Sequence, residues 1–199
     1  MNAEKIADAV ARRLFVELEA SGRHVHVTAQ QAQKLFGHPL TPQRPLSQPG
    51  QFLAEQRVTV VGPKGEFRDV AVLGPERKQA QVEISLTDGR TLGIQPPIRL
   101  SGDIQGSPGA VLVGSRGRVT LEQGVIAAQR HIHLTPEAAA RFGVTDRQRV
   151  KLQALTERPV IFQDVIVRVS PDFAPYAHLD YDEANACGFQ KGDLGRILP

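Results

Sequence analysis

Four of the six histidines in this chain lie in two copies of one short motif. Arg-His-Val-His-Val-Thr begins at Arg23 and Arg-His-Ile-His-Leu-Thr begins at Arg130, so the first histidines of the copies are 131 − 24 = 107 residues apart. The histidines alternate with Val, Ile or Leu, which is the period of a strand, so both imidazoles of a pair share one face. Paired imidazoles are typical ligands of zinc and other transition metals. The motifs therefore predict metal binding; the alternative is two strands whose histidines are hydrogen-bonded in a core or solvated.

Each pair needs further ligands, because two imidazoles do not complete a metal site. The two pairs are His24 with His26 and His131 with His133, and His178, in Tyr-Ala-His-Leu-Asp, is the best additional candidate. The alternative for His178 is a hydrogen-bonded core histidine.

A carboxylate and an arginine lie in one segment between the two motifs. In Gln-Val-Glu-Ile-Ser, the alternation directs Val82, Ile84 and Leu86 to the core and Glu83 to the opposite face, as a ligand or as an ordinary solvent-facing residue. Arg77 lies on the turn that leads into this strand. An arginine on a loop beside a metal is suited to bind phosphate, because its planar guanidinium makes paired hydrogen bonds to oxyanions. The alternative is that Arg77 is an ordinary surface arginine.

Composition narrows the class of protein. The 199 residues suffice for one large domain or two small ones. The single cysteine, Cys187, excludes an internal disulfide and a multi-thiolate zinc site and fits a reducing compartment. A net charge of +3 with scattered basic residues, few aromatics and no Trp disfavours nucleic acid as a partner. No apolar run is long enough for a membrane span and no secretory signal is evident, so we expect a cytoplasmic protein.

Short helices and many short strands predict a mostly-β chain of β-barrels with two similar halves. Helices are predicted over residues 1–13, from the cap Thr28 to residue 36, from the cap Thr135 to residue 142, and from Asp180 to Gly188. We expect a loop over residues 37–50 and a turn at Asp88-Gly89. Strands are predicted from Leu14 through Leu18 and over residues 57–61, 69–73, 81–86, 111–113, 118–121, 149–155 and 160–169.

Five segments together resemble one enzyme family. The segments are R-H-V-H-V-T, G-P-E-R-K-Q-A-Q-V-E-I-S, R-L-S-G-D-I-Q-G-S-P-G, Q-R-H-I-H-L-T-P-E and H-L-D-Y-D-E-A-N-A, in this order along nearly the whole chain. They resemble the phosphate propanoyltransferases, the Pdu-type zinc-dependent phosphotransacylases of bacteria. The resemblance implies the reversible conversion of short-chain acyl-CoA (propanoyl-CoA or acetyl-CoA) and phosphate into acyl phosphate and coenzyme A.

The resemblance also implies a site and a fold. It implies two zinc ions, with Arg77 binding phosphate, and a homodimer. Some relatives carry an extra N-terminal helix that directs them into bacterial microcompartments; the stretch before the first strand is short here, so we expect the cytoplasm, with the microcompartment lumen as the alternative. It implies two β-barrels with short helices, the first of residues 14–22 with 129–199 and the second of residues 23–128, after an N-terminal helix over residues 1–13. By the resemblance, one ion has the ligands His24, His26 and Glu83, and the other has His131, His133 and His178.

The mechanism that fits these residues is direct attack of phosphate on a metal-polarised thioester, without an acyl-enzyme. Three alternatives remain from the sequence. A cupin-like metal-dependent oxygenase also places His-x-His on strands, usually around one iron. A metal-dependent thioester hydrolase would use water in place of phosphate. A metal sensor or a basic RNA-binding barrel would bind without turnover.

Overall fold

The chain divides into two compact units, each built around its own β-sheet. The computed structural model describes Val10 and residues 13–198, so most of the helix predicted over residues 1–13 lies outside the described residues. The barrel unit joins the N-terminal stretch, up to Ser21, to the C-terminal stretch that begins at Arg130. The sheet unit comprises Gly22–Gln129. The chain therefore leaves the barrel unit before the first His-x-His motif and returns to it just before the second.

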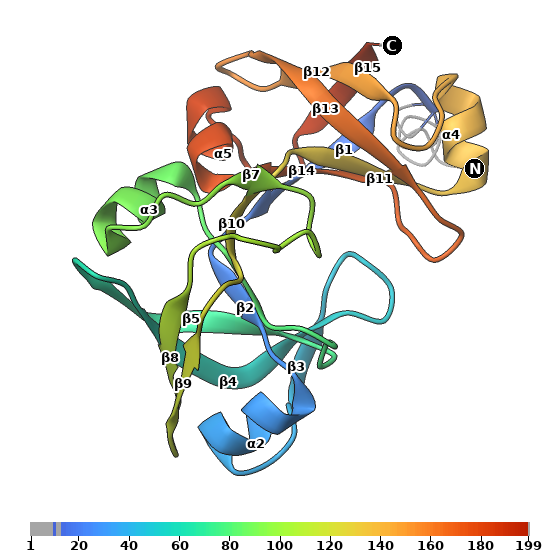
Figure 1. Cartoon of the computed structure of the whole chain (residues 1–199). Helices are drawn as coiled ribbons and strands as arrows, with labels where there is room; N and C mark the ends of the chain where they lie inside the picture. Colours follow the sequence, from blue (N-terminus) through green and yellow to red (C-terminus); the bar gives the residue numbers. More distant parts are fainter. Residues whose placement is uncertain (1–9, 11–12, 199) are drawn as a thin grey trace. The chain divides into compact units, whose positions relative to one another are not determined.

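The barrel unit is a closed barrel of six strands (Figure 1). β1 precedes the rest of the unit by more than a hundred residues, yet it pairs in parallel with β14 and antiparallel with β15. Alternate side chains of these strands fill the barrel, and Leu152, Ile132 and Leu134 are completely buried. The strands follow the order β1 (Val16–Ser21), β14 (Tyr176–Asp180), β11 (His131–Leu134), β13 (Ile161–Val169), β12 (Arg149–Leu155) and β15 (Leu194–Leu198).

The sheet unit is one curled sheet with its own apolar core. β2 lies inside it, antiparallel to β6 and parallel to β5. The order is β7 (Ile98–Arg99), β10 (Val125–Ala128), β6 (Gln81–Glu83), β2 (His24–His26), β5 (Glu66–Gly74), β4 (Phe52–Val61), β8 (Ala110–Val113) and β9 (Arg118–Leu121), with β3 (Pro42–Pro45) paired to β4. The predicted mostly-β fold of barrels with short helices is confirmed, one barrel being closed and the other a curled half-barrel.

Each His-x-His strand is followed by a short helix with the same caps. Thr28 caps α2 (Ala29–Phe36) and Thr135 caps α4 (Pro136–Phe142), because each hydroxyl accepts a hydrogen bond from a backbone N–H of the first turn. A glycine in the left-handed region ends both helices, at the residues that the sequence predicts. The capping box at Asp180 likewise opens α5 (Tyr181–Cys187), as predicted.

The structure corrects several local predictions. The strand predicted over residues 81–86 ends at Glu83, and Ser85 caps the helix α3 (Leu86–Leu92), which contains the Asp88-Gly89 pair read as a turn. Leu86 is therefore exposed, although Val82 and Ile84 are buried as expected. Leu14 is helical, and the strand after it begins at Val16. The predicted loop over residues 37–50 contains the exposed strand β3.

We predict that the barrel core and not the outer surface of β12 determines the stability of the barrel unit. Leu152→Ala should lower the free energy of unfolding by about 2–5 kcal/mol, because it leaves a cavity in a packed core. Leu155→Ala, on the same strand at a side chain that is 39% exposed, is the matched control and should change it by less than about 1 kcal/mol. Urea denaturation followed by circular dichroism measures both; equal losses would contradict the assignment of the barrel interior.

Candidate metal centres

The histidine pair of the sheet unit forms a buried cluster with a carboxylate. β2 and β6 pair so that His24 lies directly opposite Glu83. One ligand atom from each of His24, His26 and Glu83 lies within 4.8 Å of the others, and each residue is less than a tenth exposed. We call these three residues the sheet cluster. Two imidazoles and one carboxylate are a donor set that binds zinc, and also iron.

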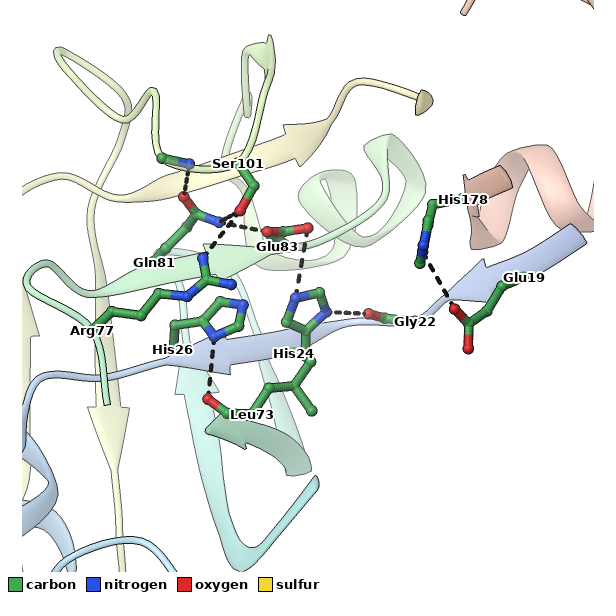
Figure 2. Close-up of polar contacts among 11 residues, drawn as sticks. Glu19, Gly22, His24, His26, Leu73, Arg77, Gln81, Glu83, Ser101 and His178 are labelled. Atoms are coloured by element: carbon green, nitrogen blue, oxygen red, sulfur yellow. Dashed lines mark hydrogen bonds and ion pairs between the residues drawn. The ribbon is translucent and has the colours of Figure 1, made fainter. Parts of the chain in front are cut away.

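Backbone carbonyls orient both imidazoles of the sheet cluster (Figure 2). His24 Nδ1 lies 2.8 Å from the carbonyl oxygen of Gly22, and His26 Nδ1 lies 3.1 Å from that of Leu73. A ring that donates its Nδ1–H in this way presents Nε2 as the metal-binding nitrogen. His24 Nε2 lies 3.6 Å from a carboxylate oxygen of Glu83.

The electrostatics of the sheet cluster favour the metal-binding forms of Glu83 and His26 and a protonated His24. Burial alone would raise the pKa of Glu83, but the charge and hydrogen bond of His24 outweigh it, and the Glu83 pKa is lowered, so the carboxylate is ionised. Burial alone would lower the pKa of His24, but the charge of Glu83 outweighs it, and the His24 pKa is raised. Burial and the charges of His24 and Arg77 lower the pKa of His26 well below its ordinary value, so this ring is neutral. A cation at Glu83 would take the place of the proton on His24.

The histidine pair of the barrel unit forms a second cluster on the same antiparallel strand pairing. β11 and β14 pair so that His131 lies directly opposite His178. One ligand atom from each of His131, His133 and His178 lies within 4.8 Å of the others. We call these residues the barrel cluster. His131 and His133 are buried, and the side chain of His178 is 13% exposed.

The surroundings of His133 indicate whether the barrel cluster suits a metal ion. Both of its ring nitrogens are buried, and neither has a hydrogen-bond partner among the described residues. Burial and the charges of His131 and His178 lower the pKa of His133 to about 2, so the ring is neutral and at least one nitrogen offers a lone pair. A buried polar atom without a partner costs free energy, and a metal ion would satisfy it. The residues present fit a metal ion.

Arg77 lies beside the sheet cluster and is held by a small polar network. Its guanidinium donates to the hydroxyl of Ser101 at 3.1 Å, and the same hydroxyl accepts from Gln81 at 2.8 Å (Figure 2). The Gln81 side chain also donates to Glu83 and accepts from the backbone N–H of Gly102. A cavity of about 330 Å³ adjoins Arg77, Gln81 and Gly102. The network therefore links the arginine to the carboxylate of the cluster.

The sequence did not identify every residue that positions these clusters. Gln81 entered the sequence analysis only as part of Gln-Val-Glu-Ile-Ser, and Ser101 only as part of R-L-S-G-D-I-Q-G-S-P-G. An ion pair also joins the arginine before each histidine pair to an acidic residue in the first turn of a helix. Arg23 pairs with Asp88 of α3 at 2.7 Å, and Arg130 pairs with Glu183 of α5 at 2.7 Å. A repeated spacing in the sequence could have identified these two ion pairs. Asp88 is five residues after Glu83, and Glu183 is five residues after His178.

Among the described residues, none of the helices is long and apolar enough to cross a membrane.

Comparison with known proteins gives the family of the chain. The family model described as phosphate propanoyltransferase matches residues 17–190. The chain is 54% identical over 184 residues to a phosphate propanoyltransferase of Enterococcus faecalis, covering 92% of this chain and 87% of the relative. It is 48% identical over 197 residues to one of Clostridioides difficile, covering 98% and 94%. It is 50% identical over 181 residues to one of Thermotoga maritima, covering 89% and 86%. The chain belongs to the phosphate propanoyltransferase family and is an acyltransferase.

Proposed function

We propose that this chain is a phosphotransacylase that interconverts propanoyl-CoA or acetyl-CoA and phosphate with the acyl phosphate and coenzyme A, using two zinc ions. The observation that carries the proposal is the pair of clusters, each with three nitrogen or oxygen ligands gathered around a His-x-His strand. Membership of the family supports the reaction type. A single, buried cysteine fits the reducing conditions of the cytoplasm, where we propose that the chain works.

The proposed ligands are the sheet cluster for one ion and the barrel cluster for the other. Each cluster offers three protein ligands. Catalytic zinc sites are typically built from three protein ligands, which leaves a position for substrate or water. A zinc ion bound there would supply Lewis acidity, which polarises a thioester carbonyl and stabilises the departing thiolate without a proton donor.

Arg77 is the proposed phosphate-binding residue. Its hydrogen bond to Ser101 holds the guanidinium at the cavity, where its planar fork can make paired hydrogen bonds to a phosphate. Holding phosphate beside the thioester makes the attack effectively intramolecular, which in favourable cases lowers the barrier by roughly 7–11 kcal/mol.

The acyl group should pass directly from sulfur to phosphate. In this step the carbon–sulfur bond of the thioester breaks, a carbon–oxygen bond to phosphate forms, and the thiolate of coenzyme A leaves. The one cysteine, Cys187, is buried in the barrel core and donates to the carbonyl of Ala184 at 3.4 Å. Burial raises its pKa, so Cys187 remains a protonated thiol and is a poor nucleophile.

One observation favours a second candidate function. The sheet cluster has the two-histidine, one-carboxylate composition of non-haem iron oxygenases. The barrel cluster argues against that function, because a mononuclear iron site has no use for three further histidines. Metal identity and stoichiometry separate the two functions.

The first prediction of the proposal is phosphate-dependent release of coenzyme A. Purified protein given propanoyl-CoA or acetyl-CoA should release thiol, detected with a thiol reagent, only when phosphate is present, and acyl phosphate should accumulate in equal amount. A chelator should abolish the activity, and added zinc should restore it. Thioester loss without phosphate would indicate a hydrolase, and an acyl group trapped on the protein by rapid quenching would contradict direct transfer.

The second prediction concerns the number of bound ions. Zinc-loaded, desalted protein should contain about two zinc ions per chain by elemental analysis, because each cluster supplies three ligands. His24→Ala and His131→Ala should each lose about one ion. His38→Ala is the matched control, because His38 is an exposed histidine whose Nδ1 lies 2.7 Å from the carbonyl oxygen of Pro39, and it should keep both. One iron per chain would instead support the oxygenase.

The third prediction concerns Arg77. Arg77→Ala should raise the KM for phosphate by roughly 10- to 100-fold, since a hydrogen bond to a charged group contributes about 1.5–3 kcal/mol. The zinc content should stay unchanged, because Arg77 is not a ligand. Arg68→Ala removes an exposed arginine of the same unit and should leave the KM unchanged. Loss of zinc from the Arg77 variant would show that this residue supports the metal and not the phosphate.

A further inference from the structure

The two clusters differ in what lies behind their histidines. In the sheet cluster, the backbone carbonyls of Gly22 and Leu73 accept from the two imidazoles. In the barrel cluster, a carboxylate faces the third histidine. Nδ1 of His178 lies 3.5 Å from Oε2 of Glu19, and the Glu19 side chain is about one-third exposed, at 35% (Figure 2).

Strand pairing places Glu19 there. In the parallel pair of β1 and β14, Glu19 is in register with His178. Val16 and Leu18 of β1 are buried in the barrel core, so the alternation of the strand turns Glu17 and Glu19 to the other face, with the histidine. The carboxylate is therefore held beside the imidazole by the backbone of the barrel.

The equivalent position of the sheet unit holds an apolar residue. Ile126 precedes His131 by five residues, as Glu19 precedes His24 by five. In the parallel pair of β10 and β6, Ile126 is in register with Glu83, the residue that corresponds to His178. Each cluster is thus associated with one carboxylate. In the sheet cluster the carboxylate is a candidate ligand, and in the barrel cluster it lies behind a candidate ligand.

We propose that Glu19 is a positioning residue of the barrel cluster, accepting the Nδ1–H of His178 so that this ring binds a metal ion through Nε2. The inference rests on the proposed function, which places an ion at that cluster. Three neutral imidazoles leave the full charge of a divalent ion uncompensated, and a carboxylate behind one of them makes the ring a stronger ligand and offsets part of that charge. Glu83 would offset charge directly in the sheet cluster, where the carboxylate is itself a candidate ligand.

Zinc affinity of the barrel cluster tests the proposal. The background is the full chain with His24→Ala, which removes a ligand of the sheet cluster and leaves the barrel cluster as the stronger site. Affinity is measured by competition with a chromogenic chelator in this background and with Glu19→Gln or Glu19→Leu added. We expect Glu19→Leu to weaken zinc binding by about 10- to 100-fold and Glu19→Gln to weaken it less, because the amide can still accept the hydrogen bond but lacks the charge.

Glu17→Gln is the matched control, because it removes the same charge from the same face of β1, two residues away, where the register partner is Tyr176. It should leave zinc affinity unchanged. Thermal unfolding in excess chelator should be similar for the Glu19 and Glu17 variants, while the rise in Tm on adding zinc should shrink only for the Glu19 variants.

The outcomes separate the two proposals. Zinc binding of equal strength in the background chain and in both Glu19 variants would overturn the role of Glu19 and leave the proposed metal centre standing. An equal loss with Glu17→Gln would also overturn it, since a general charge effect would then account for the result. Failure of the background chain to bind any zinc would overturn both the barrel metal centre and this inference.

Discussion

The register between two antiparallel strands holds each candidate cluster together. His24 lies opposite Glu83 and His131 lies opposite His178, and directly opposed side chains are neighbours on one face of a sheet. A slip of one residue would turn the third candidate ligand to the other face. Apolar packing disfavours this slip. In the sheet unit, Val25 lies between the two histidines, points to the opposite face of the sheet and is completely buried in the apolar core. Apolar packing on one face therefore fixes the polar geometry on the other.

Each cluster is also anchored at the ends of its strands. The strand that carries the third candidate ligand runs into a helix cap two residues later, and the first turn of that helix supplies an acid to the arginine that precedes the histidine pair. An ion pair of this kind contributes little to stability when it is partly exposed. Its value here lies in orientation, since it connects the two strands that must bring their side chains together. The barrel cluster needs such support, because the buried nitrogens of His133 cost free energy when nothing binds them.

Local structure was predictable where caps and periodicity agree. The helices α2, α4 and α5 have a polar cap at one end and a glycine at the other, and β9 and β12 alternate cleanly, so their bounds match the prediction. α3 was missed because Asp88-Gly89 has the form of a turn, although Ser85 and Asp88 form a capping box. β7, β10, β14 and β15 are not predicted, because none of them has a strong turn signal at both ends and β7 has only two residues. The position of Glu19 could not be predicted, because its neighbour His178 is 178 − 19 = 159 residues away and parallel pairing leaves no local signal.

The structural duplication extends beyond the residues that are identical in the two His-x-His motifs. The strand that precedes each motif also belongs to the other unit. Helix-ending glycines follow at the same distance, since Gly93 is ten residues after Glu83 and Gly188 is ten after His178, although few of the residues between them are alike. β1 precedes β2 of the sheet unit along the chain but is a strand of the barrel unit. β10 precedes β11 of the barrel unit but pairs within the sheet unit. A contiguous half of the chain therefore cannot form the barrel, because the strand beside His178 would be missing. Within this shared frame, a single position on the leading strand, occupied by Glu19 in one copy and Ile126 in the other, is enough to make the two candidate centres chemically different.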